Sequence, residues 1–238
     1  MSKFILKVIA LFIIGTIGGI FADQILWPYF IERPLFYEYR LDKAPVYINE
    51  TREIIIQENT ALKNIVEKVE KSVAGVKTQT KAGKFLQGSG LIISSDGLMV
   101  TLAELVPYGS TFNFYIDEKK VVCKILKRDL EQNLALIKIE QENLPTVKFA
   151  DLEKLKLGER VFLVGVIFKE KTPQKMVNQG IIKYFGEDSI NTNIFESKAL
   201  QGSPLFDIEG NVLGLNTVDS YGKVITIPIS KIKIFTGF

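Results

Sequence analysis

The stretch from Gly88 to Thr101 reads GSGLIISSDGLMVT, and the rest of the chain can be interpreted outward from it. It contains two short apolar runs, residues 89–94 and 98–102, on either side of Ser95-Asp96-Gly97. An Asp-Gly pair between two such runs is a strong signal for the tight turn of a β-hairpin. We therefore expect a two-stranded hairpin here.

Short strands bounded by turn signals continue from this hairpin toward the C-terminus. We expect the remaining strands of a first group at residues 112–116, 121–126 and 134–139, and those of a second group at residues 161–167, 176–185, 190–195, 204–207, 211–217 and 223–228. A last short helix is expected at residues 230–235. Two groups of about six strands with few helices between them indicate an all-β domain, either two barrels or a sandwich, divided into residues 73–150 and 151–238.

The N-terminal end is apolar enough to cross a membrane. Residues 4–22 contain a single charge, Lys7, and would form a helix ~28 Å long, close to the ~30 Å hydrocarbon thickness of a bilayer. A cleaved signal peptide is the alternative, but the exit sequence Ile20-Phe21-Ala22 lacks a small residue at the first cleavage position. We therefore favour a retained anchor, with residues 1–23 forming a cytoplasmic stub and the span.

The charges around the span predict its orientation. Lys3 and Lys7 precede it, whereas Asp23 and Glu32 follow it. The positive-inside rule then places the N-terminus in the cytoplasm and the remainder outside it. We expect a single-pass cell-membrane protein with an extracytoplasmic β domain.

Two further segments are expected between the anchor and the strands. Residues 24–59 are aromatic and contain three prolines, and we interpret them as a juxtamembrane connector with one short strand at residues 53–58. Residues 60–72 carry Leu62, Ile65 and Val69 at helical spacing, which predicts a short amphipathic helix leading into the β domain. A coiled-coil oligomerisation stretch is the alternative, but two heptads are too few to indicate one.

The composition excludes several kinds of active site. The chain has no histidine and one cysteine, Cys123, so a Ser-His-Asp triad, a His-ligated metal and a cysteine-cluster metal site are excluded. The 30 basic and 27 acidic residues give a formal charge of +3, too small a bias to indicate nucleic-acid binding. We expect no nucleic-acid partner, no metal and no cofactor, and we interpret Cys123 as core filling.

The order of the local motifs is more specific than the strand pattern. The hairpin and the TLAE that begins at Thr101 are similar to G-S-G-F-I-I…D-G-x-x-V-T-x-x-H in HtrA (Do)-type trypsin-like serine proteases. Four later motifs resemble motifs of that family and occur in the same order. Residues 129–138 (DLEQNLALIK) resemble D-x-x-x-D-L-A-V-L-K, and residues 199–205 (ALQGSPL) resemble G-N-S-G-G-P-L. Residues 210–217 (GNVLGLNT) resemble G-x-V-I-G-I-N-T, and residues 224–228 (VITIP) resemble G-F-A-I-P. The resemblance implies two six-stranded antiparallel β-barrels with the active site between them. The PDZ module that usually follows is expected to be absent.

The same resemblance implies a degenerate catalytic triad. Glu104 stands at the position of the family's histidine, Asn133 at that of its aspartate, and Gln201 at that of its nucleophilic serine. An amide is no useful nucleophile, and a carboxylate is a poor general base at neutral pH. Ala199 and Leu200 replace the Gly-Asn of the oxyanion loop, where glycine's freedom at positive φ helps to aim the backbone N–H. We therefore expect no catalytic residues and interpret the chain as a pseudoprotease.

The degenerate site leaves one chemical alternative. We expect the three polar residues at the triad positions to hydrogen-bond to one another in the vacated site. The alternative is a relocated nucleophile, Ser203, which lies two residues after the old one and would need Lys198 as its base. A Ser-Lys dyad requires a buried lysine, and nothing in the sequence demands one.

A cleft of this kind receives an extended peptide against a strand edge, and this binding mode does not need the triad. The strand edge is expected at four consecutive residues, Leu215, Asn216, Thr217 and Val218. The leading hypothesis is a membrane-anchored, inactive domain that binds an unfolded or peptide protein partner in or near the cleft. Two alternatives stay open: a serine-type endopeptidase with non-standard catalytic residues, and a structural or assembly role with a vestigial cleft.

Overall fold

The computed structural model describes residues 2–32, 60–170 and 172–238. The chain divides into two compact units, Met1–Ile55 and Ile56–Phe238. Most of the expected connector, with its expected strand at residues 53–58, lies outside the described residues.

The N-terminal unit contains an apolar helix. Helix α1 spans Ser2–Phe21 and passes into a π-helical stretch, η1, at Ala22–Glu32. The segment Lys3–Trp27 is long and apolar enough to cross a membrane. The predicted apolar helix is therefore present, and helical structure continues past residue 23 into the first part of the expected connector.

The first half of the β domain is an antiparallel sheet of seven strands, in the order β5-β4-β1-β2-β3-β7-β6. Their bounds are β1 Val73–Gln79, β2 Phe85–Ile92, β3 Leu98–Leu102, β4 Thr111–Ile116, β5 Lys119–Val121, β6 Cys123–Asp129 and β7 Leu134–Ile139. The predicted hairpin is formed by β2 and β3. Its turn requires glycine, because Gly97 has a φ of 100° and a Cβ there would lie 2.3 Å from the carbonyl oxygen of Ile139.

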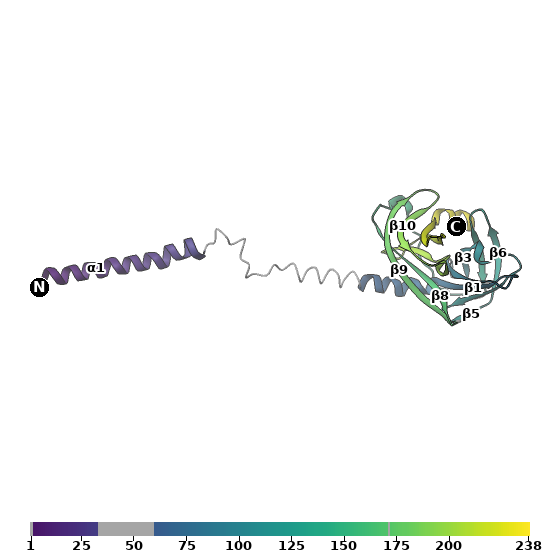
Figure 1. Ribbon diagram of the computed structural model, residues 1–238, viewed down its shortest axis with the longest axis horizontal. Helices are drawn as coiled ribbons and strands as arrows, with labels where there is room; N and C mark the ends of the chain where they lie inside the picture. The colour runs from purple at the N-terminus through teal and green to yellow at the C-terminus, as the bar shows by residue number, and fades with distance from the viewer. Residues whose placement is uncertain (1, 33–59, 171) are drawn as a thin grey trace. The chain divides into compact units, whose positions relative to one another are not determined.

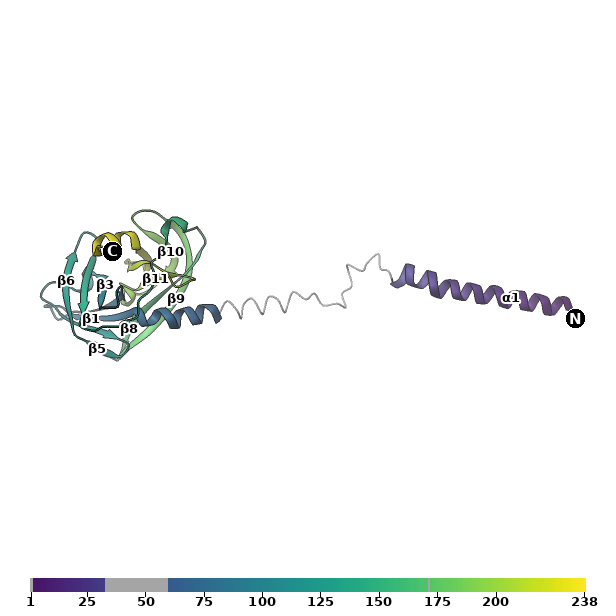
Figure 2. The same ribbon diagram turned by 180° about the vertical axis from the view of Figure 1, so that it is seen from behind.

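The second half is a closed barrel of six strands, in the order β10-β13-β12-β11-β8-β9. Their bounds are β8 Arg160–Lys169, β9 Thr172–Phe185, β10 Ile190–Phe195, β11 Pro204–Asp207, β12 Val212–Val218 and β13 Lys223–Pro228. Figures 1 and 2 show β9 and β10 on one side of the β domain and β6 on the opposite side. The predicted C-terminal helix is α3, Ile229–Thr236.

The expected all-β class is confirmed, with differences in the first half. Strand pairing closes only the second half into a barrel, and the first remains a sheet with β5 and β6 at its edges. The single strand expected at residues 121–126 is two strands, because the chain leaves the ladder at the exposed Val122. Strand β1 was not expected as a strand, since its first four residues are all buried and show no alternation of apolar and polar side chains.

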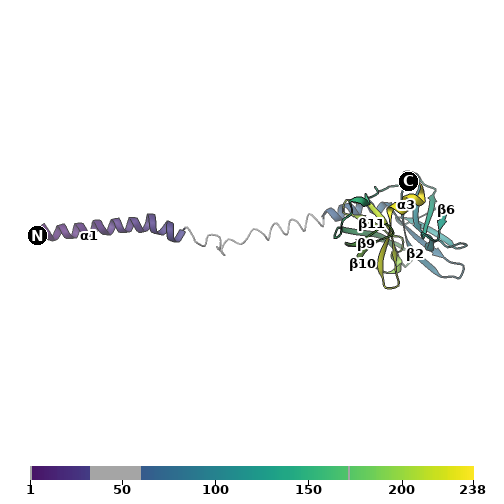
Figure 3. The same ribbon diagram turned by 90° about the horizontal axis from the view of Figure 1, so that it is seen from above.

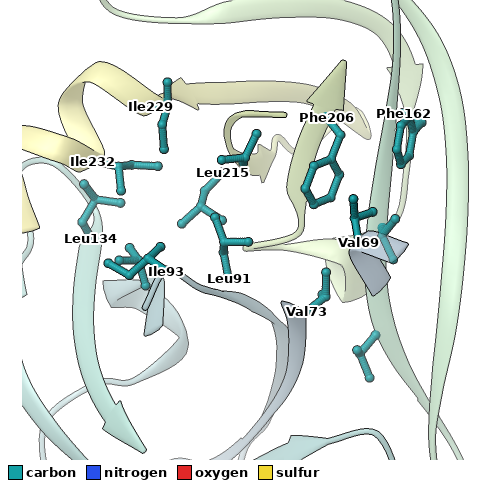
Figure 4. Close-up of a cluster of buried hydrophobic side chains, with 14 of the residues drawn as sticks. Val69, Val73, Leu91, Ile93, Leu134, Phe162, Phe206, Leu215, Ile229 and Ile232 are labelled. Atoms are coloured by element: carbon teal, nitrogen blue, oxygen red, sulfur yellow. The ribbon is translucent and has the colours of Figure 1, made fainter. Parts of the chain in front are cut away.

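The two halves share one hydrophobic core cluster. It contains Leu91 and Leu134 from the first half and Phe162 and Phe206 from the second, whose rings stack with centroids 5.4 Å apart (Figure 4). Because one cluster spans both halves, the cleft between them is held between walls that are fixed relative to each other.

Both flanking helices pack into the same cluster. Residues 60–69 form a helix that packs Leu62 and Ile65 against it and buries Val69, which confirms the predicted amphipathic helix. Helix α3 contributes Ile232 and Phe235, and Figure 3 shows it between β6 and β11. Helices from both ends of the β domain's sequence therefore contribute side chains to the shared cluster.

Candidate functional site

Of the three residues expected at the triad positions, Glu104 and Gln201 line one pocket, and Asn133 is hydrogen-bonded to Glu104. Glu104 lies in a 3-10 turn, η4, at Ala103–Leu105, Asn133 immediately precedes β7, and Gln201 follows a second 3-10 turn, η6, at Lys198–Leu200. Glu104 and Gln201 line the same pocket of about 340 Å³. The complete lining is Lys84, Phe85, Leu86, Gln87, Glu104, Leu105, Lys198, Ala199 and Gln201.

Glu104 and Asn133 bind each other through two hydrogen bonds. The Asn133 side-chain amide donates from Nδ2 to Glu104 Oε1 at 3.0 Å, and its Oδ1 accepts from the backbone N–H of Glu104 at 3.0 Å. The Asn133 carbonyl also accepts from the N–H of Ala103 at 3.1 Å. Asn133 has a φ of 52°, a left-handed conformation that asparagine adopts more readily than most residues. Hydrogen bonds from the backbone N–H groups of Ala103 and Glu104 therefore hold Asn133 in place beside the Glu104 carboxylate.

Gln201 does not join that pair, contrary to the expectation that all three residues hydrogen-bond to one another. Its side chain is 7% exposed and its amide binds the backbone of Val218 instead. Gln201 Nε2 donates to the Val218 carbonyl at 3.2 Å, and Gln201 Oε1 accepts from the Val218 N–H at 2.9 Å. Both polar atoms of the amide are thus used within the domain.

The loop before Gln201 directs its N–H groups back into its own turn. The Gln201 N–H donates to the Lys198 carbonyl at 3.3 Å, and the Leu200 N–H donates to Ser197 at 3.0 Å. The Gln201 carbonyl accepts from the N–H of Ser89 at 2.8 Å, which fixes the loop against β2. The backbone N–H of Gln201 is therefore already engaged within its own turn.

The proposed alternative nucleophile faces the interior. Ser203 is fully buried, and its Oγ accepts a hydrogen bond from Asn216 Nδ2 at 3.1 Å. Asn216 Oδ1 in turn accepts from Thr226 Oγ1 at 2.6 Å. Among the described residues, Lys198 makes no hydrogen bond to Ser203, and only Lys198 of the two lines the pocket. The structure does not assemble the Ser-Lys dyad.

The expected peptide-binding strand residues lie on β12, between β11 and β13. Leu215 is opposite Pro204 and Ile227, and Asn216 exchanges hydrogen bonds of 2.8 Å with Gly202 and Ser203. Thr217 Oγ1 donates to the Ile225 carbonyl at 2.9 Å, and Val218 binds the Gln201 amide. All four residues therefore have partners on β12's neighbours or on Gln201.

The pocket is lined by basic, apolar and amide side chains together with one carboxylate. Lys84 and Lys198 supply two ammonium groups and Phe85 an exposed aromatic ring, while the lining residues carry no hydroxyl or thiol. The described part of the chain contains no group of three or more His, Cys, Asp or Glu residues placed to hold a metal ion. Lys84 and Phe85 were not predicted as site residues, because the sequence alone does not show whether an aromatic residue at the start of a strand faces the core or the cleft.

Comparisons with known proteins agree with this architecture. A family model described as "Trypsin-like peptidase domain" matches residues 88–215. A "Probable periplasmic serine endoprotease DegP-like" from Pseudomonas putida is 34% identical over 139 residues, covering 55% of this chain and 28% of that protein. A "Putative serine protease HhoB" from Synechocystis sp. is 31% identical over 158 residues, covering 60% of this chain and 37% of that protein.

A solved structure shares the fold. The structure titled "HtrA-type protease AlgW with tripeptide" matches with a TM-score of 0.66 and 24% identity, covering 74% of this chain and 62% of that one. The chain aligns with little more than a quarter of the DegP-like relative's length.

Proposed function

Since this chain belongs to the HtrA-type trypsin-like peptidase family, we propose that it is an inactive member that binds a peptide or protein segment in or near the former active-site cleft. One observation carries the proposal: every polar side chain at a triad position is hydrogen-bonded to another part of the domain. Glu104 is held by Asn133, and Gln201 is held by Val218. The Gln201 amide has no ionisable proton and is already bonded within the domain, so this position offers no nucleophile.

The chemistry supports inactivity at each step of peptide hydrolysis. The reaction needs a nucleophile, a general base and donors for the oxyanion. Gln201 supplies no nucleophile, Glu104 is bound by Asn133, and the Gln201 N–H is bonded to Lys198. Loss of the nucleophile or the base alone costs ~10⁶ in turnover, so the combined changes leave no useful activity.

The pocket's lining supports binding of an apolar or acidic segment. Phe85 lines the pocket and is 63% exposed, so its ring offers apolar contact area to a ligand. Lys84 and Lys198 outnumber the one carboxylate of the lining, which is already bonded to an amide. An acidic side chain next to an apolar one therefore complements the pocket best.

A matched pair of variants tests the binding proposal. The full-length chain in detergent micelles is screened against an immobilised library of random decapeptides, and the affinity of the selected peptides is measured by fluorescence anisotropy. Phe85→Ser should weaken binding several-fold, whereas Phe195→Ser, which changes an equally exposed phenylalanine (64%) outside the pocket lining, should not. Equal losses in both variants would place the binding surface elsewhere.

Two readouts separate the alternatives. Turnover of casein and labelling by a serine-directed phosphonate should both be undetectable in the wild type. Labelling of the wild type would instead favour the endopeptidase hypothesis. An unlabelled chain that selects no peptide, whether as the wild type or as Gln201→Ala, would favour a structural or assembly role.

We also propose that the N-terminal helix is a retained anchor with its N-terminus in the cytoplasm. Support comes from the apolar segment Lys3–Trp27, from Lys3 and Lys7 at its start, and from the word periplasmic in the names of several relatives. Alkaline carbonate should leave the protein in the membrane fraction, and external protease should reach a C-terminal tag. Release of a shortened soluble form would show a cleaved signal sequence.

A further inference from the structure

Strand β12 extends beyond Pro204, where its antiparallel neighbour β11 begins, and continues to form hydrogen bonds on that side. On the β11 side, Asn216 exchanges backbone hydrogen bonds with Gly202 and Ser203. Followed backward from β11, the chain turns away from β12 at Gly202, which has a φ of 73°. The next residue of β12 that faces this side is Val218, two positions on, because backbone groups alternate sides along a strand. The partner of Val218 is the side chain of Gln201.

The Gln201 amide reproduces the hydrogen bonds of a peptide strand at this position. A primary amide offers a carbonyl acceptor and an N–H donor, as a backbone peptide does. In an antiparallel ladder, a hydrogen-bonded residue gives its N–H and receives at its C=O. Val218 does both with Gln201, at 2.9 Å and 3.2 Å. The Gln201 side chain thus completes one further rung of the β12 ladder.

We propose that Gln201 is an internal substitute for a bound peptide backbone, which keeps the Val218 edge closed until an extended segment displaces it. This inference rests on the proposed peptide-binding function and adds its regulation: the chain competes with its own ligand for one rung of β12. Gln201, at the former nucleophile position, would then set the affinity of the cleft for the peptide.

Displacement requires only a side-chain rotation. The backbone of Gln201 is fixed on both sides, by its N–H to Lys198 and by its carbonyl to Ser89. Its side chain borders the 340 Å³ pocket, which offers space for an alternative rotamer. An incoming peptide would replace two hydrogen bonds by two of the same kind, so the exchange is a competition and not a block. Removing the competitor raises the apparent affinity, since the open state no longer has to be selected.

Hydrogen exchange of the Val218 amide tests the contact without any ligand. In the full-length protein in micelles, the Val218 N–H should be protected in the wild type and exchange faster in Gln201→Ala. Gln201→Glu keeps an oxygen acceptor and should retain protection of that N–H while losing the donor to the Val218 carbonyl. The Asn216 amide, bonded to Ser203, is the internal control and should stay protected in both variants. Unchanged exchange at Val218 in Gln201→Ala would overturn the inference.

Binding of the same random decapeptide library tests the competition. Gln201→Ala should bind selected peptides about 5- to 150-fold more tightly than the wild type, the range for two competing hydrogen bonds, with Gln201→Glu in between. Peptide bound to Gln201→Ala should restore protection of the Val218 amide. Equal affinities for both chains would overturn this inference and leave the proposed function standing. No binding to either chain would overturn the proposed function itself, and binding to Gln201→Ala alone would support the competition.

Discussion

The hydroxyl oxygen of Ser89 on β2 accepts a hydrogen bond of 2.8 Å from the backbone N–H of Val166 on β8, and so joins the two halves of the β domain. Ser89 is fully buried. Its own N–H donates to the Gln201 carbonyl at 2.8 Å, and its carbonyl accepts from Thr101 Oγ1 at 2.7 Å. One serine of the first motif therefore holds β8, β3 and the cleft loop together.

Ser89→Ala should lower the free energy of unfolding by about 1–3 kcal/mol, because it leaves the buried Val166 N–H without its partner. Urea unfolding of the full-length protein in micelles measures the change. The control is Ser95→Ala, which alters an exposed serine of the adjacent turn and should stay within about 0.5 kcal/mol of the wild type. Indistinguishable midpoints for the two variants would show that this bond contributes nothing.

Helix α3 offers a matched pair of isoleucines for the shared core. Ile232 is fully buried in the cluster, whereas Ile234 is 79% exposed. Ile232→Ala should cost about 2–5 kcal/mol of stability, because the cavity it leaves cannot be refilled. Ile234→Ala should cost less than about 0.5 kcal/mol. If both variants unfold at the wild-type midpoint, α3 does not pack as described.

Restoring the triad alone should not restore useful proteolysis. Glu104→His, Asn133→Asp and Gln201→Ser supply the base, the orienting carboxylate and the nucleophile. The backbone N–H at residue 201 would still donate to Lys198, however, and losing one oxyanion donor costs ~10²–10³ in rate. The triple variant should cleave casein weakly or not at all.

Adding Ala199→Gly to the triple variant should raise whatever rate is seen, because glycine lets the loop reach the φ values that aim the N–H outward. Leu200→Asn should destabilise the loop instead, since Leu200 is fully buried and an amide there would be desolvated. Wild-type turnover that disappears in Ser203→Ala would contradict the pseudoprotease proposal and favour a relocated nucleophile.

The single cysteine should react slowly in the folded protein. Burial, and secondarily the charge of Glu140, raises the pKa of Cys123 from its ordinary value of 9.0 to about 11. Because the thiolate is the reactive form, alkylation by iodoacetamide at pH 8 should be about 100-fold slower than in urea-unfolded protein, and should speed up as the pH rises toward 11. Mass spectrometry gives both rates. Glu140→Gln should react somewhat faster, and equal rates in folded and unfolded protein would contradict this assignment.

Features that depend on local sequence were predictable. The Asp96-Gly97 turn and the helix at residues 60–69 follow from turn chemistry and side-chain spacing, which act over a few residues. The second-half strands were located within a few residues, apart from β9, which begins at Thr172 rather than at residue 176. Strand β1 could not be recognised from its pattern because it lies between β2 and β4 with its first residues buried, so its composition carries no alternation.

Part of the cleft was predictable, whereas Lys84, Phe85 and the hydrogen-bond partner of Gln201 were not. The motif order assigned Glu104, Asn133 and Gln201 to one region, and Glu104 and Asn133 do bind each other. The partner of Gln201 could not be inferred, because its rotamer depends on where Val218 lies after β12 has paired with β13. Such choices are made by tertiary contacts rather than by the residue's neighbours in sequence.

The shared cluster combines Val69, near the start of the β domain's sequence, with Phe235, near its end. This long sequence separation constrains the order in which the domain can fold during synthesis. A chain emerging from the ribosome cannot complete this core until α3 has been synthesised, although the hairpin around Gly97 can form much earlier. Under the proposed membrane topology, the unfinished domain would cross the membrane with Leu91 and Leu134 still uncovered. The nascent domain would then depend on chaperones during export, and shortening α3 would expose it to quality-control proteases before it reached its final location.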